Sequence, residues 1–428
     1  MTGAPARPRP MPMSYVLPIR RMDDSDPEQL TDYLRWLAAR VEVIVVDGSP
    51  PEVFARHHRR WHPLVRHLPP DPSLSGRNGK VLGVLTGVPA ATHEDVVIAD
   101  DDVRYDEDGL REVRRLLRRA DLVQPQNYFD PLPWHAYWDT GRILLNRAIG
   151  ADFPGTLAVR RGVFLAAGGY DPDVLFENLE LIRTVRAFGG SVAAPAGLYV
   201  RRLPPTTRHF ASQRVRQAYD ELAQPVRLVA ALLVLPGVAA AVAARRPGLL
   251  TAAAAAVIAV AETGRRKAGG PVVFPPATAV LAPLWLIERG VCSWLAVAQG
   301  VFCGGVRYAG GRLGRAAHST RTLRRRLAAS VAGSPRIGLP RLPGGRTGVD
   351  VADSAVRAQS ANPGDRGQAV SGREIPHDEW VVLGDQIDEG FQRLFIGVER
   401  NPLLRSSADI LSATLDVAKG SLGDREGQ

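Results

Sequence analysis

The chain has 428 residues, of which 45% are hydrophobic and 23% charged, and its 54 Lys+Arg against 44 Asp+Glu give a formal net charge of +10. This composition excludes disorder throughout, allows two or three domains, and favours anionic partners such as nucleic acid, phospholipid headgroups or phosphorylated substrates. The two cysteines, Cys292 and Cys303, stand in an apolar stretch without metal-ligand spacing. We therefore expect neither a disulfide framework nor a zinc site.

Residues 1–13 are rich in Pro and Arg and lack the uninterrupted apolar run of a signal peptide. We expect this segment to be disordered, and we expect membrane contact to come from internal segments.

Residues 14–224 alternate short apolar runs with helical patterns, which is typical of a mainly parallel sheet with helices on both faces. The predicted strands are 14–19, 41–46 and 95–99. The predicted helices are 27–39, one that begins at 80–86, 110–119 and 141–149. The order of these elements predicts an α/β domain that begins as a nucleotide-binding half-fold.

Acidic residues follow two of these strands. Asp100, Asp101 and Asp102 come directly after the strand at 95–99, where carboxylates can hold a hard divalent cation that neutralises a diphosphate. Asp47 ends the strand at 41–46, where it can accept hydrogen bonds from a nucleoside. Both positions are also compatible with solvated or capped turns, and for Asp47 taken alone the turn is the favoured interpretation.

The run Ser75-Gly76-Arg77-Asn78-Gly79-Lys80-Val81 predicts a basic turn that opens a helix. Backbone amides and the Lys80 ammonium suit contact with a phosphate or a base. The run lacks the spacing and the hydroxyl residue of a Walker motif, so it is weak as a signal on its own.

Residues 225–306 have a different character. The stretches 226–244 and 249–261 are nearly free of charge and predict a helical hairpin. The first is long enough to span a bilayer, whereas the second is short against the roughly 20 residues that a spanning helix needs. The stretch 272–306 contains prolines and Glu288-Arg289, so it predicts two short passes or a kinked interfacial segment.

The segment 307–330 is basic, with seven arginines and no acid between residues 307 and 326. The positive-inside tendency places it on the cytoplasmic side, and a cytoplasmic catalytic domain then requires an even number of crossings. We expect residues 331–375 to be a disordered linker, and residues 376–428 to be a small helical module.

Several motifs occur together in the order seen in family 2 glycosyltransferases. They are Leu17-Pro18, Val45-Val46-Asp47-Gly48-Ser49, Asn78-Gly79-Lys80, Asp100-Asp101-Asp102, Pro154 to Arg161, Gly168-Gly169-Tyr170, Phe176-Glu177-Asn178-Leu179-Glu180-Leu181 and Gln213-Arg214-Val215-Arg216-Gln217. Over about residues 14–310 the chain resembles membrane-associated members of that family, and most closely its ceramide glucosyltransferase-like branch.

The resemblance implies a GT-A type domain that inverts the anomeric carbon as it moves a hexose from a nucleotide diphosphate sugar to a lipid or lipid-linked hydroxyl. It implies that Asp100 and Asp102 bind Mg²⁺ or Mn²⁺. The residues that it implies for donor binding are Asp47, Lys80, Asp100, Asp101, Gln213 and Arg216. The implied location is the cell membrane, with several crossings and a cytoplasmic catalytic domain.

Two positions depart from the family pattern. Asn178 stands where the family usually carries the aspartate that deprotonates the acceptor, and an amide cannot take that proton. Glu177 is the predicted base, with Glu180 one turn later as a substitute. Both could instead cap the start of a helix. Gln217 replaces the Trp of the membrane-bound signature, which removes a stacking contact.

Three rival hypotheses are compatible with the sequence. The same fold could carry out nucleotidyl transfer, which releases pyrophosphate. Asn178 and Gln217 also fit a catalytically inactive membrane scaffold. Nucleic-acid binding is disfavoured, because the basic residues concentrate beside apolar segments, a pattern that fits anionic lipid better.

Overall fold

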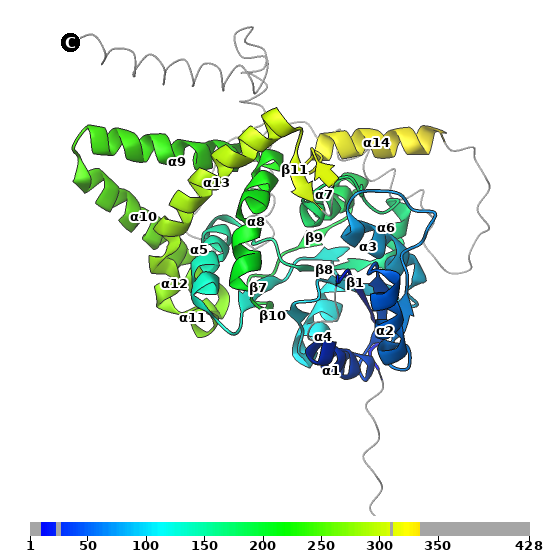
Figure 1. The fold of residues 1–428 in the computed structure, drawn as a ribbon. Helices are drawn as coiled ribbons and strands as arrows, with labels where there is room; N and C mark the ends of the chain where they lie inside the picture. Colours follow the sequence, from blue (N-terminus) through cyan, green and yellow to red (C-terminus); the bar gives the residue numbers. More distant parts are fainter. Residues whose placement is uncertain (1–9, 23–26, 309–310, 334–428) are drawn as a thin grey trace, which may run out of the picture. The chain divides into compact units, whose positions relative to one another are not determined.

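The computed structural model describes residues 10–22, 27–308 and 311–333. A seven-stranded sheet in the order β3-β2-β1-β4-β8-β6-β9 organises residues 14–224, the predicted catalytic domain, which is called the catalytic region below (Figure 1). Its strands are β1 (Ser14–Ile19), β2 (Glu42–Asp47), β3 (Arg66–Leu68), β4 (Asp95–Ala99), β6 (Leu122–Val123), β8 (Thr156–Arg160) and β9 (Val192–Ala193). Strands β3, β2, β1 and β4 are parallel, and β8 runs antiparallel to both β4 and β6. The sheet is therefore mainly parallel, as predicted.

Helices cover both faces of this sheet. Successive residues of β1 and β2 point to opposite faces, so Tyr15 and Val43 belong to one hydrophobic cluster whereas Val16 and Ile44 belong to the other. The first cluster includes residues of α1 (Pro27–Ala38) and α4 (Glu107–Leu117), and the second includes residues of α3 (Gly79–Ala90) and α7 (Glu177–Phe188). Both faces of β1 and β2 are buried, which explains why these strands are largely apolar.

The remaining helices of the catalytic region differ modestly from prediction. Helices α2 (Pro51–Trp61) and α6 (Arg161–Ala166) were not predicted, and α5 (Trp134–Ile149) begins seven residues before the predicted start at residue 141. Helix α4 begins at Glu107 because the Asp106 side chain accepts a hydrogen bond from the Gly109 amide and caps it. Helix α8 (Thr207–Tyr219) follows, and the 3₁₀ helix η1 (Asp220–Ala223) continues from it.

A second, three-stranded sheet places a basic strand beside the acidic cluster. Its order is β5 (Val103–Arg104), β10 (Tyr199–Arg202) and β7 (Gln126–Phe129). Arg202 pairs with Val103, the residue that follows Asp102. The register of this sheet therefore brings an arginine next to carboxylates about one hundred positions earlier in the sequence.

Among the described residues, three helices after the catalytic region are long and apolar enough to cross a membrane: Pro225–Ala243, Pro247–Val273 and Ala282–Cys303. The first is α9, the second comprises α10 (Pro247–Arg266), η2 (Lys267–Gly269) and α11 (Gly270–Val273), and the third is α13. The short α12 (Pro276–Val280) precedes α13. The prediction that the second stretch is too short was wrong, since it has 27 residues. Helices α9 and α10 form the predicted hairpin (Figure 1).

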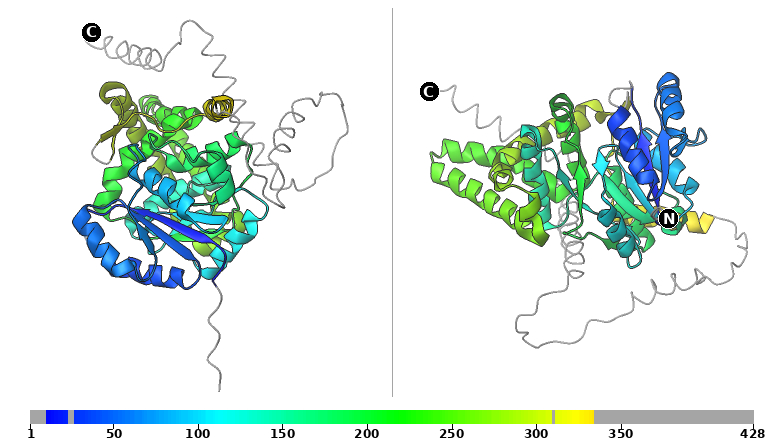
Figure 2. Two further views of the ribbon diagram at one scale, coloured as in Figure 1. Left: turned by 90° about the vertical axis from the view of Figure 1, so that its right-hand side faces the viewer. Right: turned by 90° about the horizontal axis from the view of Figure 1, so that it is seen from below.

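These helices pack on the catalytic region, as Figure 2 also shows. Helix α10 lies against α5, where Gly264 leaves room for the Leu144 carbonyl, and the buried Arg147 guanidinium donates to the Gly264 carbonyl at 3.2 Å. Helix α13 lies against α5, α8 and α9. Large apolar side chains of all three helices remain exposed, including Leu233, Leu249, Leu295 and Phe302.

The basic segment folds back onto the catalytic region. It forms the hairpin of β11 (Val306–Tyr308) and β12 (Gly311–Leu313), followed by α14 (Thr320–Gly333), which packs against α7. The rest of the predicted linker and the predicted module at residues 376–428 lie outside the described residues, as do residues 1–9.

Candidate active site

An open cleft of about 390 Å³ lies at the carboxyl ends of β1 and β4, where parallel sheets bind their ligands. Residues that are distant in sequence meet in it. They include Lys80 at the start of α3, the acidic cluster Asp100–Asp102 after β4, Glu177 at the start of α7, and Gln213, Arg216 and Asp220 on α8 and η1.

Lys80 joins two of the predicted carboxylates. Its Nζ lies 2.5 Å from Asp100 Oδ1 and donates to Glu177 Oε1 at 2.8 Å. Although burial disfavours the ammonium, the negative charges of Asp100 and Glu177 outweigh that effect and raise the pKa of Lys80. Lys80 therefore stays cationic at the centre of the cleft.

The position of Lys80 follows from a helix cap. The buried Asn78 side chain accepts from the amides of Lys80 and Val81, which fixes the first turn of α3. The Asn78 amide nitrogen donates to the Val174 carbonyl at 2.9 Å, just before α7. One side chain thus sets both the Lys80 helix and the segment that leads into Glu177.

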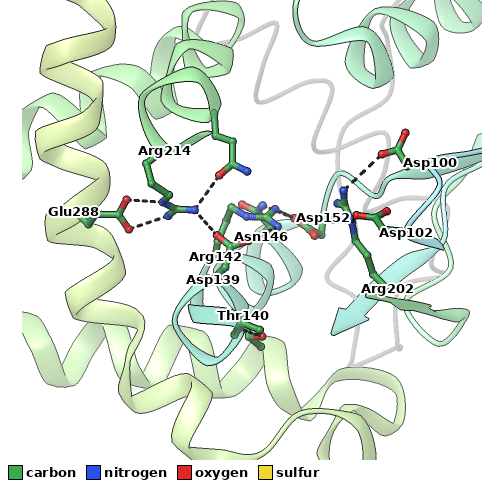
Figure 3. A network of polar contacts seen from close by, with 12 residues as sticks. Asp100, Asp102, Asp139, Thr140, Arg142, Asn146, Asp152, Arg202, Arg214 and Glu288 are labelled. Carbon is green, nitrogen blue, oxygen red and sulfur yellow. Dashed lines mark hydrogen bonds and ion pairs between the residues drawn. The ribbon is translucent and has the colours of Figure 1, made fainter. Parts of the chain in front are cut away.

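Arg202 neutralises the other side of the acidic cluster (Figure 3). Its Nε lies 2.8 Å from Asp102 Oδ2, and its Nη2 lies 3.6 Å from Asp100 Oδ2. Burial and the charge of Asp100 raise the pKa of Asp102, while Arg202 opposes them. Asp101, which also lines the cleft, pairs with Arg21 at 2.9 Å.

The described residues at the carboxyl end of β4 offer a free carboxylate oxygen and space for a divalent cation. Asp102 Oδ1 is buried and has no hydrogen-bond partner among the described residues. Gly155 also leaves space at the cluster, because a Cβ at this position would lie 2.7 Å from Asp100 Oδ2. Within the described ranges no group of three or more His, Cys, Asp or Glu side chains could hold a metal ion. A cation here would therefore need ligands from the substrate as well.

Asp47 does not line the cleft, which corrects its predicted place at the nucleoside. The residue is 1% exposed, and its carboxylate accepts from the Ser49 amide at 2.9 Å and lies 2.7 Å from His57 Nδ1 and 3.2 Å from His67 Nε2. Burial opposes its charge, but the hydrogen bonds from His57 and His67 hold the pKa of Asp47 below its usual range. The side chain stabilises the end of β2, which agrees with the turn interpretation.

Glu180 also lies away from the cleft, so its predicted role as a substitute base does not fit the structure. The side chain is fully buried and accepts from the His318 amide at 2.6 Å, and its other oxygen lies 2.8 Å from His318 Nδ1. Both residues stand in the first turn of α7, but the Glu177 carboxylate contacts Lys80 whereas Glu180 reaches the segment before α14. The carboxylate ties that segment to α7.

The two departures from the family pattern have local explanations. The Asn178 amide donates to the Pro154 carbonyl at 2.7 Å, next to Gly155. Gln217 accepts from Arg214 Nη1 at 2.9 Å. Arg216 donates to Gln213 Oε1 at 3.0 Å, and its guanidinium lies over the Tyr308 ring. Both predicted residues of α8, Gln213 and Arg216, therefore line the cleft.

The structure adds cleft residues that sequence reasoning did not identify. Asp220 lines the cleft beside Arg216, and Tyr308 of β11 donates to Asn78 Oδ1 at 3.1 Å. Others come from the apolar helices and α5: Arg142, Asn146, Arg227, Trp285 and Arg289. The Glu288-Arg289 pair within an apolar stretch was the sequence feature that could have indicated this wall of the cleft, because charged residues in such stretches usually pair with one another in the protein interior.

A polar network connects this wall to the catalytic region (Figure 3). Arg214 of α8 donates from Nε and Nη2 to the two oxygens of Glu288 on α13, at 2.6 and 2.8 Å. Its Nη1 donates to Asp139 Oδ1 on α5 at 2.8 Å. Arg142 continues the network from Asp139 to Asp152. These ion pairs make α13 part of the cleft wall.

Comparisons with solved structures find glycosyltransferases. A mannosyltransferase from Pyrobaculum calidifontis, in complex with GDP-Man and Mn²⁺, is 21% identical over 68% of this chain and 90% of that chain, with a TM-score of 0.44. A glucosyl-3-phosphoglycerate synthase from Mycobacterium tuberculosis is 20% identical over 45% and 70%, with a TM-score of 0.31. TarS from S. aureus, in complex with UDP-GlcNAc, is 13% identical over 47% and 61%, with a TM-score of 0.34. No protein-family model and no curated protein matches the sequence.

Proposed function

We propose that this protein is a membrane-associated family 2 glycosyltransferase that moves a sugar, with inversion, from a nucleotide diphosphate sugar to a lipid or lipid-linked hydroxyl. The observation that carries the proposal is the meeting of Lys80, Asp100, Asp102 and Glu177 in one cleft. These residues belong to three of the motifs that the sequence shares with the family.

The donor diphosphate would lie between Lys80 and the acidic cluster. Lys80 and Arg202 supply the cationic donors for its oxygens, since charge-assisted hydrogen bonds to phosphate are the strong ones. Asp100 and Asp102 would hold Mg²⁺ or Mn²⁺, which neutralises the charge that develops on the leaving group. Binding of the diphosphate would replace the ion pairs that these side chains now make with one another.

Sugar transfer is then a direct displacement. The acceptor oxygen forms a bond to the anomeric carbon as the bond to the diphosphate oxygen breaks, and the nucleoside diphosphate leaves with that electron pair. The acceptor hydroxyl loses its proton to a carboxylate of the cleft. Glu177 is the residue predicted for this step because Asn178 stands where the family carries its aspartate, and Glu177 lines the cleft.

Membrane association is supported by the apolar helices and the basic segment beside them. We propose several crossings, with the catalytic region and the basic segment in the cytoplasm. The arrangement is tested at the turn between α9 and α10, which carries Arg245 and Arg246 and would lie outside the cell if the hairpin crosses the membrane. A cysteine is placed at this turn and labelled with a reagent that does not enter cells. Labelling in intact cells would support a hairpin that crosses the membrane. Labelling only after lysis would indicate instead a hairpin that lies within the headgroup layer.

The activity is tested with membranes that contain the full chain. They are incubated with a panel of labelled nucleotide sugars and Mn²⁺, after which lipids and released nucleotides are separated. Labelled lipid together with nucleoside diphosphate is the expected result. Release of pyrophosphate would indicate nucleotidyl transfer instead, and no turnover of any donor would support an inactive scaffold.

A further inference from the structure

Asp220 places a second carboxyl group in the cleft near Glu177. It is the first residue of η1, directly after α8, and it lines the cleft together with Glu177 and Arg216. Its Oδ1 is buried and has no hydrogen-bond partner among residues 10–22, 27–308 and 311–333. A buried carboxylate oxygen without a donor is costly in a folded protein, so its retention indicates a polar partner that arrives with a ligand.

Charges of both signs face this group. Glu177 and Glu221 are the acidic neighbours, and Arg216 of α8 and Arg289 of α13 are the basic ones. Burial is the largest influence, the charge of Glu177 adds to it, and together they raise the pKa of Asp220 to about 8 against the opposing arginines. A general base works best when its pKa lies near the working pH, because it is then both available and basic.

Glu177 is in a different state. Its Oε1 accepts from Lys80 at 2.8 Å, and Lys80 is shared with Asp100. This oxygen of Glu177 is therefore already engaged by an ammonium. Glu177 is well placed to orient Lys80 towards a diphosphate, whereas Asp220 Oδ1 accepts no hydrogen bond from the part of the chain that the structure describes.

We propose that Asp220 accepts the proton of the acceptor hydroxyl in sugar transfer and that Glu177 positions Lys80. This inference rests on the proposed function. As the acceptor oxygen bonds to the anomeric carbon and the nucleoside diphosphate leaves, the O–H electron pair stays on that oxygen and the proton moves to Asp220 Oδ1. The proton then leaves to water when the product departs.

The test compares Asp220→Asn and Glu177→Gln in the full chain, with Asp32→Asn on the exposed surface of α1 as the matched control. Donor turnover by membranes is measured from pH 6 to 9.5 with the nucleotide sugar that the wild type uses best. Binding of UDP and GDP with Mn²⁺ is measured for the same proteins after solubilisation. Asp220→Glu is included because it keeps a carboxyl group at this position.

The wild-type rate should rise with pH and level off above about 8. Asp220→Asn should lower the rate by about a hundredfold or more and remove this rise, which is the usual range for loss of a general base. Its nucleotide affinity should stay within about threefold of the wild type, and Asp220→Glu should regain part of the pH-dependent rate. Glu177→Gln should instead weaken nucleotide binding, because it releases Lys80.

An Asp220→Asn protein that keeps the wild-type rate and pH profile would overturn the inference and leave the proposed function intact. The inference also fails if Asp220→Glu shows no pH-dependent rate while it binds nucleotide normally. If the wild type turns over no donor at all, the proposed function fails and this inference fails with it.

Discussion

Replacement of Arg214 by methionine tests how firmly α13 is attached to the catalytic region. Arg214 is 7% exposed, and its guanidinium holds Glu288 through two hydrogen bonds and Asp139 through one. Methionine retains much of the apolar stem but removes the charge. Glu288 would keep a hydrogen bond from Trp138 Nε1 at 2.6 Å, and Asp139 would keep Arg142 at 3.2 Å.

The expected loss is large because one partner of a buried charge network is removed. Breaking such a pair typically destabilises a protein by about 3–5 kcal/mol. The retained hydrogen bonds place the expected value at the lower end, about 3 kcal/mol. The assay is urea unfolding of the detergent-solubilised chain, with Arg208→Met on the exposed side of the same helix as the control. Surface substitutions of this kind stay within about 0.5 kcal/mol.

The same network predicts a pH dependence. Burial opposes ionisation of Asp139, but Arg142 and Arg214 outweigh it and hold the pKa of Asp139 below its usual range. A depressed pKa contributes stability that is present above the unfolded-state value near 4 and is lost as pH falls towards the folded-state value. Arg214→Met should therefore lose less stability on acidification than the wild type. A variant as stable as Arg208→Met, with unchanged acid sensitivity, would refute this account of the network.

Three further predictions concern the cleft. Gly155→Ala should lower donor turnover at least about tenfold without unfolding the protein, because the added Cβ would displace the Asp100 carboxylate. The control is Gly237→Ala, whose added Cβ would meet no neighbouring atom of the described residues within 4 Å. Equal turnover by Gly155→Ala and Gly237→Ala would contradict the expectation. Glu180→Gln should retain donor turnover but unfold at a lower urea concentration, because the substitution breaks the buried contact with His318. A Glu180→Gln protein that is stable but inactive would instead support Glu180 as the base. Asp102→Asn should weaken the Mn²⁺ dependence of nucleotide binding at least about tenfold, and an unchanged Mn²⁺ titration would exclude this carboxylate as a ligand.

The fold was predictable because its signals are local. The short apolar runs of β1, β2 and β4 and the helical spacing of α1 indicate the element types, and their order indicates a mainly parallel sheet. The acidic cluster and Lys80 were also found from sequence, since both stand where a strand ends or a helix begins. The partner of each charged side chain could not be predicted from the sequence.

Asp47 and Glu180 illustrate this limit. Each is an acidic residue in a motif position, and each lies within hydrogen-bond distance of histidines that nothing in the local sequence connects to it. These are His57 and His67 for Asp47, and His318 for Glu180. Asp220 is the opposite case. It belongs to no motif, but the packing of α8, α13 and β11 places it in the cleft. Long-range packing therefore decides which carboxylates are structural and which remain available for chemistry.

The most direct test of the account is calorimetric titration of UDP and GDP into the solubilised wild type and Lys80→Met, each with and without Mn²⁺. If the cleft binds the diphosphate of a sugar donor, at least one nucleotide binds the wild type, Mn²⁺ strengthens that binding, and Lys80→Met weakens it by about 2 kcal/mol, or roughly thirtyfold. Equal affinity of the two proteins for a nucleotide, or no binding by the wild type with Mn²⁺ present, would contradict the central claim that Lys80 and the acidic cluster form a donor site.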